Sequence, residues 1–306
     1  MRDYLKKIVI MCLIQALVFD MNPVSISADT QQEPTAQINV TSDMVNGNEN
    51  MTKLSDTDSE KGKVLVYGRI EGSQHWTKDN IYYILTDSSL INPVIIGNLV
   101  IDPGTVICFG QGNTAHGTID TIEVKSASSL RVMNGTVTAK GTETEPIIFK
   151  QDTNDTDWGS IIFDTDIDED TQQTCGGGIF EYCQFINGGE WTSSAEGILS
   201  IDGTSDQTDR SFKLKVSNCV FDASDVVSSR QNAGKALVDG SAAIYCGAID
   251  RNTDIEVTGS IFRGMGRALE SVGTEYIYPE NFSCLIEDNT FESNGYFNNT
   301  ISEGMG

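Results

Sequence analysis

The fold of this chain is decided by NPVIIGNLVIDPGTVICFG (92–110), with TIEVKSASSLRVMNGTVTAKGTETEPIIFK (121–150) and WGSIIF (158–163) following it. Short apolar runs recur in these stretches, and most are closed by Gly, Asn or Asp. Val, Ile and Thr dominate the runs, which favours strands over helices. The D-P-G at 102–104 predicts a type II turn, because Pro presets φ and Gly accepts a positive φ. The pattern predicts an all-β chain.

Three pairs of apolar residues lie 24 or 25 positions apart in this region: Ile107 and Val132, Ile122 and Ile147, and Val137 and Ile161. A chain that returns to the same face at a fixed spacing is typical of a solenoid. In a solenoid each coil buries its apolar face only against its neighbours, so the repeats come in series. We therefore expect these pairs to stack on successive coils.

A second pattern recurs later in the chain, as IFEYCQF (179–185), KVSNCVF (215–221), EVTGSIF (256–262) and LIEDNTF (285–291). Each segment ends in a Phe, and we expect these residues to stack in one buried column: Phe185, Phe221, Phe262 and Phe291. A small or amide residue stands two positions before each Phe and predicts a second column: Cys183, Cys219, Ser260 and Asn289. A branched or aromatic residue stands five positions before each Phe: Phe180, Val216, Val257 and Ile286.

These segments carry a resemblance to a known family. The run GNLVIDPGTVICF, then PIIF, then WGSIIF resembles the opening coils of exported bacterial right-handed parallel β-helix proteins, which share the pectate-lyase-like fold. The later segments resemble the parallel β-helix repeat itself. The resemblance covers about residues 64–306 and implies a right-handed parallel β-helix of about seven to nine coils, each rising about 4.8 Å. It implies no single function, because this architecture hosts polysaccharide lyases, glycosidases, esterases, adhesins and stalks.

Composition predicts four parts. Residues 1–28 have a basic start, an apolar run and a small-residue exit, which predict a secretory signal peptide. Residues 29–62 are polar and predict a disordered linker. The aromatic residues within 63–99 predict an N-terminal cap, because an open first coil would expose strand edges. Residues 100–306 predict the β-helix, and the lack of a closing cap after the last repeat indicates either a truncated chain or a missing carboxy-terminal anchor.

The formal net charge is −24. Such a surface repels nucleic acid and anionic lipid, so we expect no nucleic-acid partner. After the signal peptide we find no apolar stretch long enough to span a membrane, and we expect an extracellular monomer, secreted or attached to the cell surface. The six later cysteines lie mostly in apolar runs without C-x-x-C spacing. We interpret them as buried small hydrophobic residues, with oxidation of a neighbouring pair as the alternative.

Two segments that echo each other, GILSIDGTSD (197–206) and CGAIDRNTD (246–254), provide candidate catalytic carboxylates: Asp202, Asp206, Asp250 and Asp254. Inverting glycoside hydrolysis needs two carboxyl groups about 6.5–9.5 Å apart, and stacked coils could supply such a pair. The alternative is that Asp ends these strands because it favours turns. The sequence signatures of pectate lyases and of galacturonan hydrolases are absent.

The acidic loop DTDIDED (164–170) offers four candidate oxygen ligands for Ca²⁺, namely Asp164, Asp166, Asp168 and Asp170, although a solvated loop explains it as well. Candidates for ligand contact are Trp191, Tyr296 and Phe297, whereas Trp158 is expected to pack in the core. We expect no required cofactor. The favoured function is a non-catalytic adhesion, glycan-binding or spacer module that meets a glycan or a host or cell-wall surface component. The alternative is a polysaccharide lyase or glycoside hydrolase.

Overall fold

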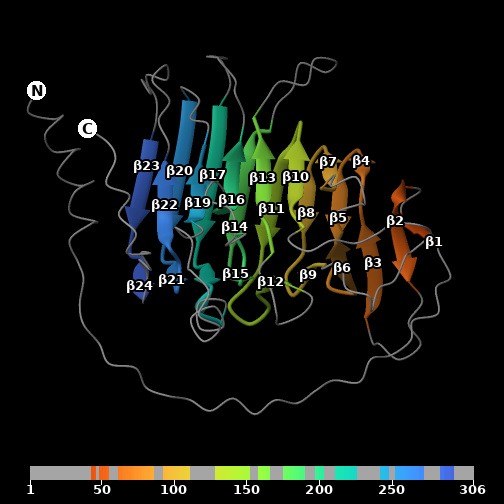
Figure 1. The fold of residues 1–306 in the computed structure, drawn as a ribbon, viewed down its shortest axis with the longest axis horizontal. Helices are drawn as coiled ribbons and strands as arrows, with labels where there is room; N and C mark the ends of the chain where they lie inside the picture. The colour runs from red at the N-terminus through yellow and green to blue at the C-terminus, as the bar shows by residue number, and fades with distance from the viewer. Residues whose placement is uncertain are drawn as a thin grey trace, which may run out of the picture. The chain divides into compact units, whose positions relative to one another are not determined.

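The computed structural model describes residues 43–45, 48–54, 61–85, 92–110, 128–151, 158–165, 175–189, 197–202, 211–225, 242–247, 252–271 and 283–292. All of them lie in the larger of the chain's two structural units, Gln37–Gly306. Within these ranges the strands form three sheets (Figure 1).

Sheet A consists, in spatial order, of β1 (Asp43–Val45), β2 (Asn48–Leu54), β3 (Gly62–Val66), β6 (Asn80–Ile84), β9 (Val106–Phe109), β12 (Ile147–Gln151), β15 (Cys183–Ile186), β18 (Val220–Asp222), β21 (Ile261–Arg263) and β24 (Thr290–Glu292). Sheet B consists of β22 (Arg267–Ser271), β19 (Ala242–Cys246), β16 (Gly197–Asp202), β13 (Ile161–Asp164), β10 (Leu130–Met133), β7 (Val94–Ile96) and β4 (Arg69–Glu71). Sheet C consists of β23 (Ser283–Glu287), β20 (Asn252–Thr258), β17 (Ser211–Ser217), β14 (Gly177–Glu181), β11 (Thr136–Lys140), β8 (Leu99–Ile101) and β5 (Gln74–Trp76).

From β3 to β21, each strand pairs in parallel with the strand three places later in the chain. The chain therefore visits sheets A, B and C in turn and then begins a new coil. This arrangement is the predicted right-handed parallel β-helix, and right-handed crossovers are the rule for parallel strands. The seven-stranded sheets B and C give seven complete coils in the described ranges.

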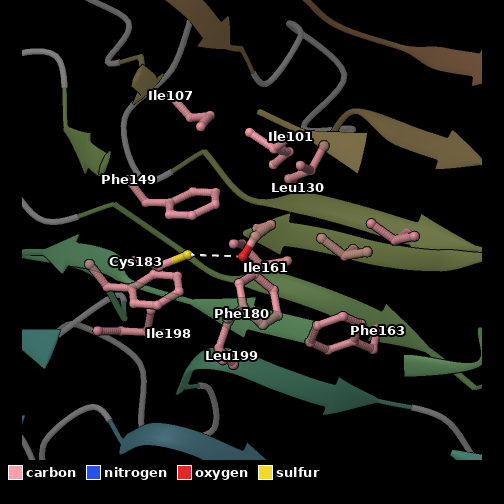
Figure 2. Packing of buried hydrophobic residues seen from close by; sticks show 14 of the residues in the cluster. Ile101, Ile107, Leu130, Phe149, Ile161, Phe163, Phe180, Cys183, Ile198 and Leu199 are labelled. Atoms are coloured by element: carbon pink, nitrogen blue, oxygen red, sulfur yellow. Dashed lines mark hydrogen bonds between the residues drawn. The ribbon is translucent and has the colours of Figure 1, made fainter. Parts of the chain in front are cut away.

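The predicted column of Phe residues is present inside sheet A. The Phe column comprises Phe149, Phe185, Phe221, Phe262 and Phe291, whose successive ring centroids lie 4.9, 4.6, 5.0 and 5.3 Å apart in nearly parallel planes. The first four rings are buried, and Phe291 on the last described coil is 55% exposed. Figure 2 shows Phe149 and Phe180 packed among buried Ile and Leu side chains of several strands.

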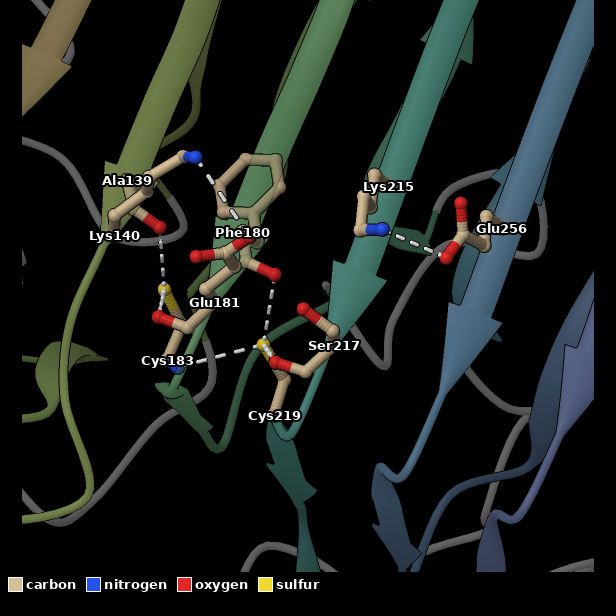
Figure 3. A network of polar contacts seen from close by, with 9 residues as sticks. All are labelled: Ala139, Lys140, Phe180, Glu181, Cys183, Lys215, Ser217, Cys219 and Glu256. Carbon is tan, nitrogen blue, oxygen red and sulfur yellow. Dashed lines mark hydrogen bonds and ion pairs between the residues drawn. The ribbon is translucent and has the colours of Figure 1, made fainter.

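The predicted column of small residues lies at the corner between sheets C and A, where it forms a hydrogen-bonded ladder. The Cys183 N–H donates to the Cys219 Sγ at 3.4 Å, and the Cys219 N–H donates to the Ser260 Oγ at 3.1 Å. The Ser260 N–H donates to the Asn289 Oδ1 at 2.8 Å. Each side chain thus satisfies a backbone donor of the preceding coil, which a buried corner requires. Figure 3 shows the two thiols of this corner ladder.

A spacing of 25 residues separates paired strands of the first coils, as between Arg69 and Val94 and between Tyr82 and Ile107, but the described residue pairs predicted from it do not stack on each other. Ile122 lies outside the described residues. Ile107 stacks on Phe149, 42 residues later in the chain, whereas Val132 belongs to sheet B and pairs with Ile95 and Phe163. Val137 and Ile161 also lie in different sheets. The loops between strands differ in length, so residues that share a coil position are not equally spaced in sequence.

Parallel coils begin earlier than the range expected for the β-helix. Residues 63–99 supply most of β3, all of β4–β7 and the first residue of β8, which pair in parallel with later strands. Trp76 and Tyr82 stack there at 4.6 Å in the core. Before them, within the expected linker 29–62, β2 pairs antiparallel with β1 on one side and with β3 on the other, and Met51 of β2 is buried. An antiparallel pair therefore forms the first edge of sheet A. The expected signal peptide lies outside the described residues.

The cysteines fit the expected packing role in five positions. Cys108, Cys175, Cys183, Cys219 and Cys246 are buried thiols, whereas Cys284 on the last described coil is exposed. The D-P-G turn is also present, since Gly104 has φ +75° and the Thr105 N–H donates to the Asp102 carbonyl at 3.3 Å. Among the described residues, no helix has the length and hydrophobicity needed to cross a membrane.

Candidate functional site

The outer face of sheet B brings together charged residues from three successive coils. In β10 the side chains of Leu130 and Val132 enter the core, so that of Arg131 points outward. The same alternation turns Asp164 of β13 and Asp202 of β16 to the outside. Asp164 and Asp202 are paired in register on neighbouring coils. The parallel stacking therefore joins residues that are 33 and 71 positions from Arg131.

Arg131 bridges the two carboxylates. Its Nη1 donates to Asp164 Oδ2 at 2.6 Å, and its Nη2 donates to Asp202 Oδ2 at 3.2 Å. The side chains of Asp164, Arg131 and Asp202 are 9%, 30% and 56% exposed, so this Arg131 cluster runs from a buried carboxylate to one that faces solvent. Two acids and one cation give the Arg131 cluster a formal charge of −1.

The pKa of Arg131 reflects this setting. Burial of the guanidinium lowers its pKa, but the hydrogen bonds and negative charges of Asp164 and Asp202 together outweigh that effect, and the net pKa is raised above its ordinary value. The guanidinium is therefore permanently charged. Its donors are directed at two fixed carboxylates, which is the fork geometry that distinguishes Arg from Lys.

Backbone contacts hold the two carboxylates in place. The N–H and the hydroxyl of Thr165 both donate to the Asp202 carbonyl, at 2.8 and 3.0 Å. The Cys175 N–H donates to the Asp164 carbonyl at 3.1 Å. Burial raises the pKa of the Cys175 thiol to about 12, so this thiol is neutral and does not compete for the guanidinium. The ends of β13 and β16 are thus tied together, and the Arg131 cluster is preorganised.

Several other charged pairs on the β-helix follow a simpler pattern. On sheet C, Lys140 pairs with Glu181 and Lys215 with Glu256, each across neighbouring strands in register (Figure 3). On sheet A, Arg263 lies between Asp222 and Glu292 in one row. Each of these pairs links in-register neighbours at the surface, which serves coil register and solubility.

The Arg131 cluster departs from that pattern in two ways. Both of its carboxylates lie on the same side of the arginine, on the two following coils. Its acidic partner Asp164 is also far more buried than Asp222 or Glu292. The Arg131 cluster therefore combines a buried carboxylate with an exposed one, and we take it as the candidate functional site.

Of the four predicted catalytic residues, the structure describes Asp202 and Asp254, and it places them on different sheets. Asp202 lies on sheet B, whereas Asp254 of β20 lies on the outer face of sheet C, 4.0 Å from the Lys213 Nζ. Asp206 and Asp250 lie outside the described residues. The two carboxylates that do stand on neighbouring coils are Asp202 and Asp164, and Asp164 was predicted as a metal ligand rather than as a partner of Asp202.

The predicted calcium ligands are represented by Asp164 alone, because Asp166, Asp168 and Asp170 lie outside the described residues. Asp164 is engaged by Arg131, and a calcium ion there would have to displace or adjoin a guanidinium. Within the described ranges, no group of three or more His, Cys, Asp or Glu side chains is arranged to hold a metal ion. Calcium binding therefore stays a prediction.

The aromatic residues proposed for ligand contact, Trp191, Tyr296 and Phe297, also lie outside the described residues. Trp158, which was expected to pack, is buried and stacks on Phe109 at 4.0 Å, and its Nε1 donates to the Ile186 carbonyl at 2.7 Å. That interpretation is confirmed. Arg131 was missed, because the sequence SSLRVM shows only a cation in a strand and gives no sign of its two partners.

Comparisons of the chain with protein-family models, with curated proteins and with solved structures found no match. The strand pairing defines the fold, and the Arg131 cluster is the candidate site.

Proposed function

We propose that this protein is a non-catalytic, extracellular glycan-binding β-helix, and that its ligand lies on the outer face of sheet B at the Arg131 cluster. The observation on which the proposal depends is the bridging of Asp164 and Asp202 by one guanidinium. When carboxylates and a guanidinium are fixed at adjacent positions, the carboxylates can accept hydrogen bonds from neighbouring hydroxyls of a sugar ring and the guanidinium can donate to them. We infer that the protein acts as a monomer at a cell surface.

The repeated coil supports a glycan rather than a small metabolite as ligand. Successive coils place binding groups about 4.8 Å apart along the axis, so the face offers a linear series of contacts. A linear polymer can use several such contacts at once, and each weak contact then adds to the affinity. The Arg131 cluster has an exposed end at Asp202 and a buried end at Asp164, and this difference would orient the bound glycan on the face.

The alternative function, polysaccharide cleavage, is favoured by one observation. Asp164 and Asp202 stand on neighbouring coils, and retaining glycosidases use two carboxyl groups about 5–5.5 Å apart. Such a reaction also needs one carboxyl group that donates a proton to the leaving group. Arg131 donates a hydrogen bond to an oxygen of each carboxylate, so both carboxylates are engaged in an ion pair. We therefore favour glycan binding over glycan cleavage as the function.

The experiment is a retention assay of the purified chain on immobilised neutral, amino-sugar and uronate glycans, with a parallel assay for new reducing ends and unsaturated products. We expect retention without turnover. Asp202→Asn should weaken retention about tenfold or more, because a hydrogen bond to a charged group is worth about 1.5–3 kcal/mol. Asp254→Asn is the matched control on sheet C and should bind as the parent does.

Each outcome decides between the functions. If the parent protein cleaves a glycan and Asp202→Asn does not, the protein is an enzyme and the proposal of a non-catalytic binding module is wrong. Equal retention of the Asp202→Asn and parent proteins would remove the Arg131 cluster from the site. Absence of both retention and turnover would overturn the proposal and leave a mechanical spacer as the function.

A further inference from the structure

A tyrosine extends the Arg131 cluster by one coil. Tyr245 of β19 alternates with the core residues Ile244 and Cys246, so its side chain lies on the outer face of sheet B. It is partly exposed and pairs in register with Ser200, two residues before Asp202. Tyr245 therefore stands on the coil that follows Asp202.

The ring of Tyr245 leans toward the row of carboxylates. A Cβ atom placed on Gly247 would come within 2.8 Å of the Tyr245 Cε1, so the ring lies over this glycine. Gly247 in turn lies beside Asp202, because it follows Cys246, the partner of Ile201, and its N–H donates to the Ile201 carbonyl at 2.9 Å. The absence of a side chain at position 247 is what admits the ring to this place.

Four successive coils thus present Arg131, Asp164, Asp202 and the Tyr245 ring along one face, over roughly 14 Å for three coil spacings of about 4.8 Å. An aromatic ring beside hydrogen-bonding groups suits a pyranose, whose apolar face stacks while its edge is hydrogen-bonded. The guanidinium is occupied by two carboxylates, so the described face offers no spare positive charge from Arg131 to a uronate. The net charges of the Arg131 cluster and of the chain are both negative, which repels an acidic polymer.

We propose that Tyr245 is the stacking platform of this site and that the ligand is a pyranose chain that presents hydroxyl or ammonium donors and no carboxylates. This inference rests on the proposed function and adds the class of ligand. Hydroxyl and ammonium groups both donate hydrogen bonds to the exposed oxygens of Asp202. The amino-sugar and neutral polymers are therefore two sources of the same chemistry, and uronate polymers are excluded.

The test measures dissociation constants by calorimetry for three probes: a glucose hexamer, a glucosamine hexamer and a galacturonate hexamer. We expect binding of the first, the second or both, and at least tenfold weaker binding of the third. Tyr245→Ala should weaken binding about tenfold, as expected for loss of one aromatic contact. Tyr245→Phe keeps the ring and should remain within about twofold of the parent.

Gly247→Ala is the sharper variant, because it keeps Tyr245 but pushes its ring aside. It should weaken binding several-fold while thermal unfolding shows that the fold is retained. If the parent binds a glycan and Tyr245→Ala binds it equally well, Tyr245 is not the stacking platform, but the proposed function is still supported. Tight binding of the galacturonate hexamer would overturn the exclusion of uronates. Failure of the parent to bind any glycan would overturn the proposed function itself, and this inference with it.

Discussion

The Phe column and the Arg131 cluster are built by the same operation, the stacking of strands on successive coils, yet they differ in what they contribute. The Phe column lies inside sheet A, where the first four rings are buried. The Arg131 cluster lies on the outside of sheet B and ends at a carboxylate that is 56% exposed. We infer that substitutions in the column affect mainly stability and that substitutions at Asp202 affect mainly ligand binding.

The comparison is tested most strongly inside the Phe column. Phe185→Ala removes a fully buried ring that stacks on Phe149 and Phe221, and should lower the free energy of unfolding by about 3–5 kcal/mol. Phe291→Ala is the matched control, because that ring is largely exposed and stacks on Phe262 alone among the described residues. We expect it to cost less than half as much. Urea unfolding measures both, and equal losses would contradict the inside-to-outside distinction.

The buried thiols predict how stability depends on alkaline pH. Burial raises the pKa of Cys175 and Cys246 to about 12, above the 9.0 of an unburied thiol. Between these values the unfolded chain releases protons that the folded chain keeps, so stability is unaffected below pH 9 and falls as the pH rises toward 12. The loss of stability should be about 1.4 kcal/mol per pH unit for each thiol, which gives roughly 2–3 kcal/mol per thiol from pH 9 to 11.

Cys246→Ala tests this dependence, because the variant lacks the loss of stability that ionisation of the Cys246 thiol causes in the parent. Its free energy of unfolding, measured by urea titration at pH 9, 10 and 11, should fall less steeply than that of the parent. If the two slopes are the same, the Cys246 thiol is not the group responsible. Comparison of slopes rather than of absolute stabilities cancels the packing effect of the substitution.

The corner ladder makes a smaller contribution than the Phe column. The Ser260 hydroxyl accepts from the Cys219 N–H and donates to the Thr258 carbonyl, both at 3.1 Å. Ser260→Ala leaves a buried donor unsatisfied and should cost about 1–3 kcal/mol. Ser260→Cys should cost less, because a thiol already fills this place at Cys219. Thermal unfolding of the two variants measures the difference, and equal costs would show that the hydrogen bond is unimportant.

The smallest expected effect is a gain in stability. Tyr182 stands at the corner between sheets C and A with φ 49°, where the next coils have Asn218 at φ 53°, Gly259 at 58° and Asp288 at 54°. A left-handed conformation costs most residues about 1–2 kcal/mol, and Asn tolerates it better. Tyr182→Asn should therefore raise the free energy of unfolding by about 1 kcal/mol. Asn218→Tyr should lower it by a similar amount, and an unchanged midpoint in both would refute the conformational argument.

Much of the fold could be predicted from local sequence, because the residues that define a coil lie within one short segment. Each seven-residue repeat contains the core Phe, the left-handed corner residue and the ladder residue together. These repeats end in Phe185, Phe221, Phe262 and Phe291. Prediction failed where it relied on spacing across loops. The coil that leads to Ile107 repeats after 25 residues, from Tyr82, but the next repeats after 42, so Val132 falls in another sheet.

The candidate site could be predicted only in part for the same reason. Asp164 and Asp202 were each selected as acidic residues near a strand end, but for different roles. Their juxtaposition depends on the register of β13 with β16, and that register is set by core side chains such as Phe163 and Ile201 rather than by the acids themselves. Nothing local marks Arg131 as their partner, and nothing in the sequence around Tyr245 indicates which coil it follows.

The sequence by itself determined the kind of fold, because alternating apolar residues, corner residues and ladder residues are local features that each coil repeats. The tertiary structure decided which outward-facing side chains meet. Parallel stacking brings residues 33 and 71 positions from Arg131 into hydrogen-bond contact with it, and that contact depends on how each intervening loop closes. The physical reason is that inward positions are constrained by burial in every coil, whereas the outward positions are free to vary until register places them side by side.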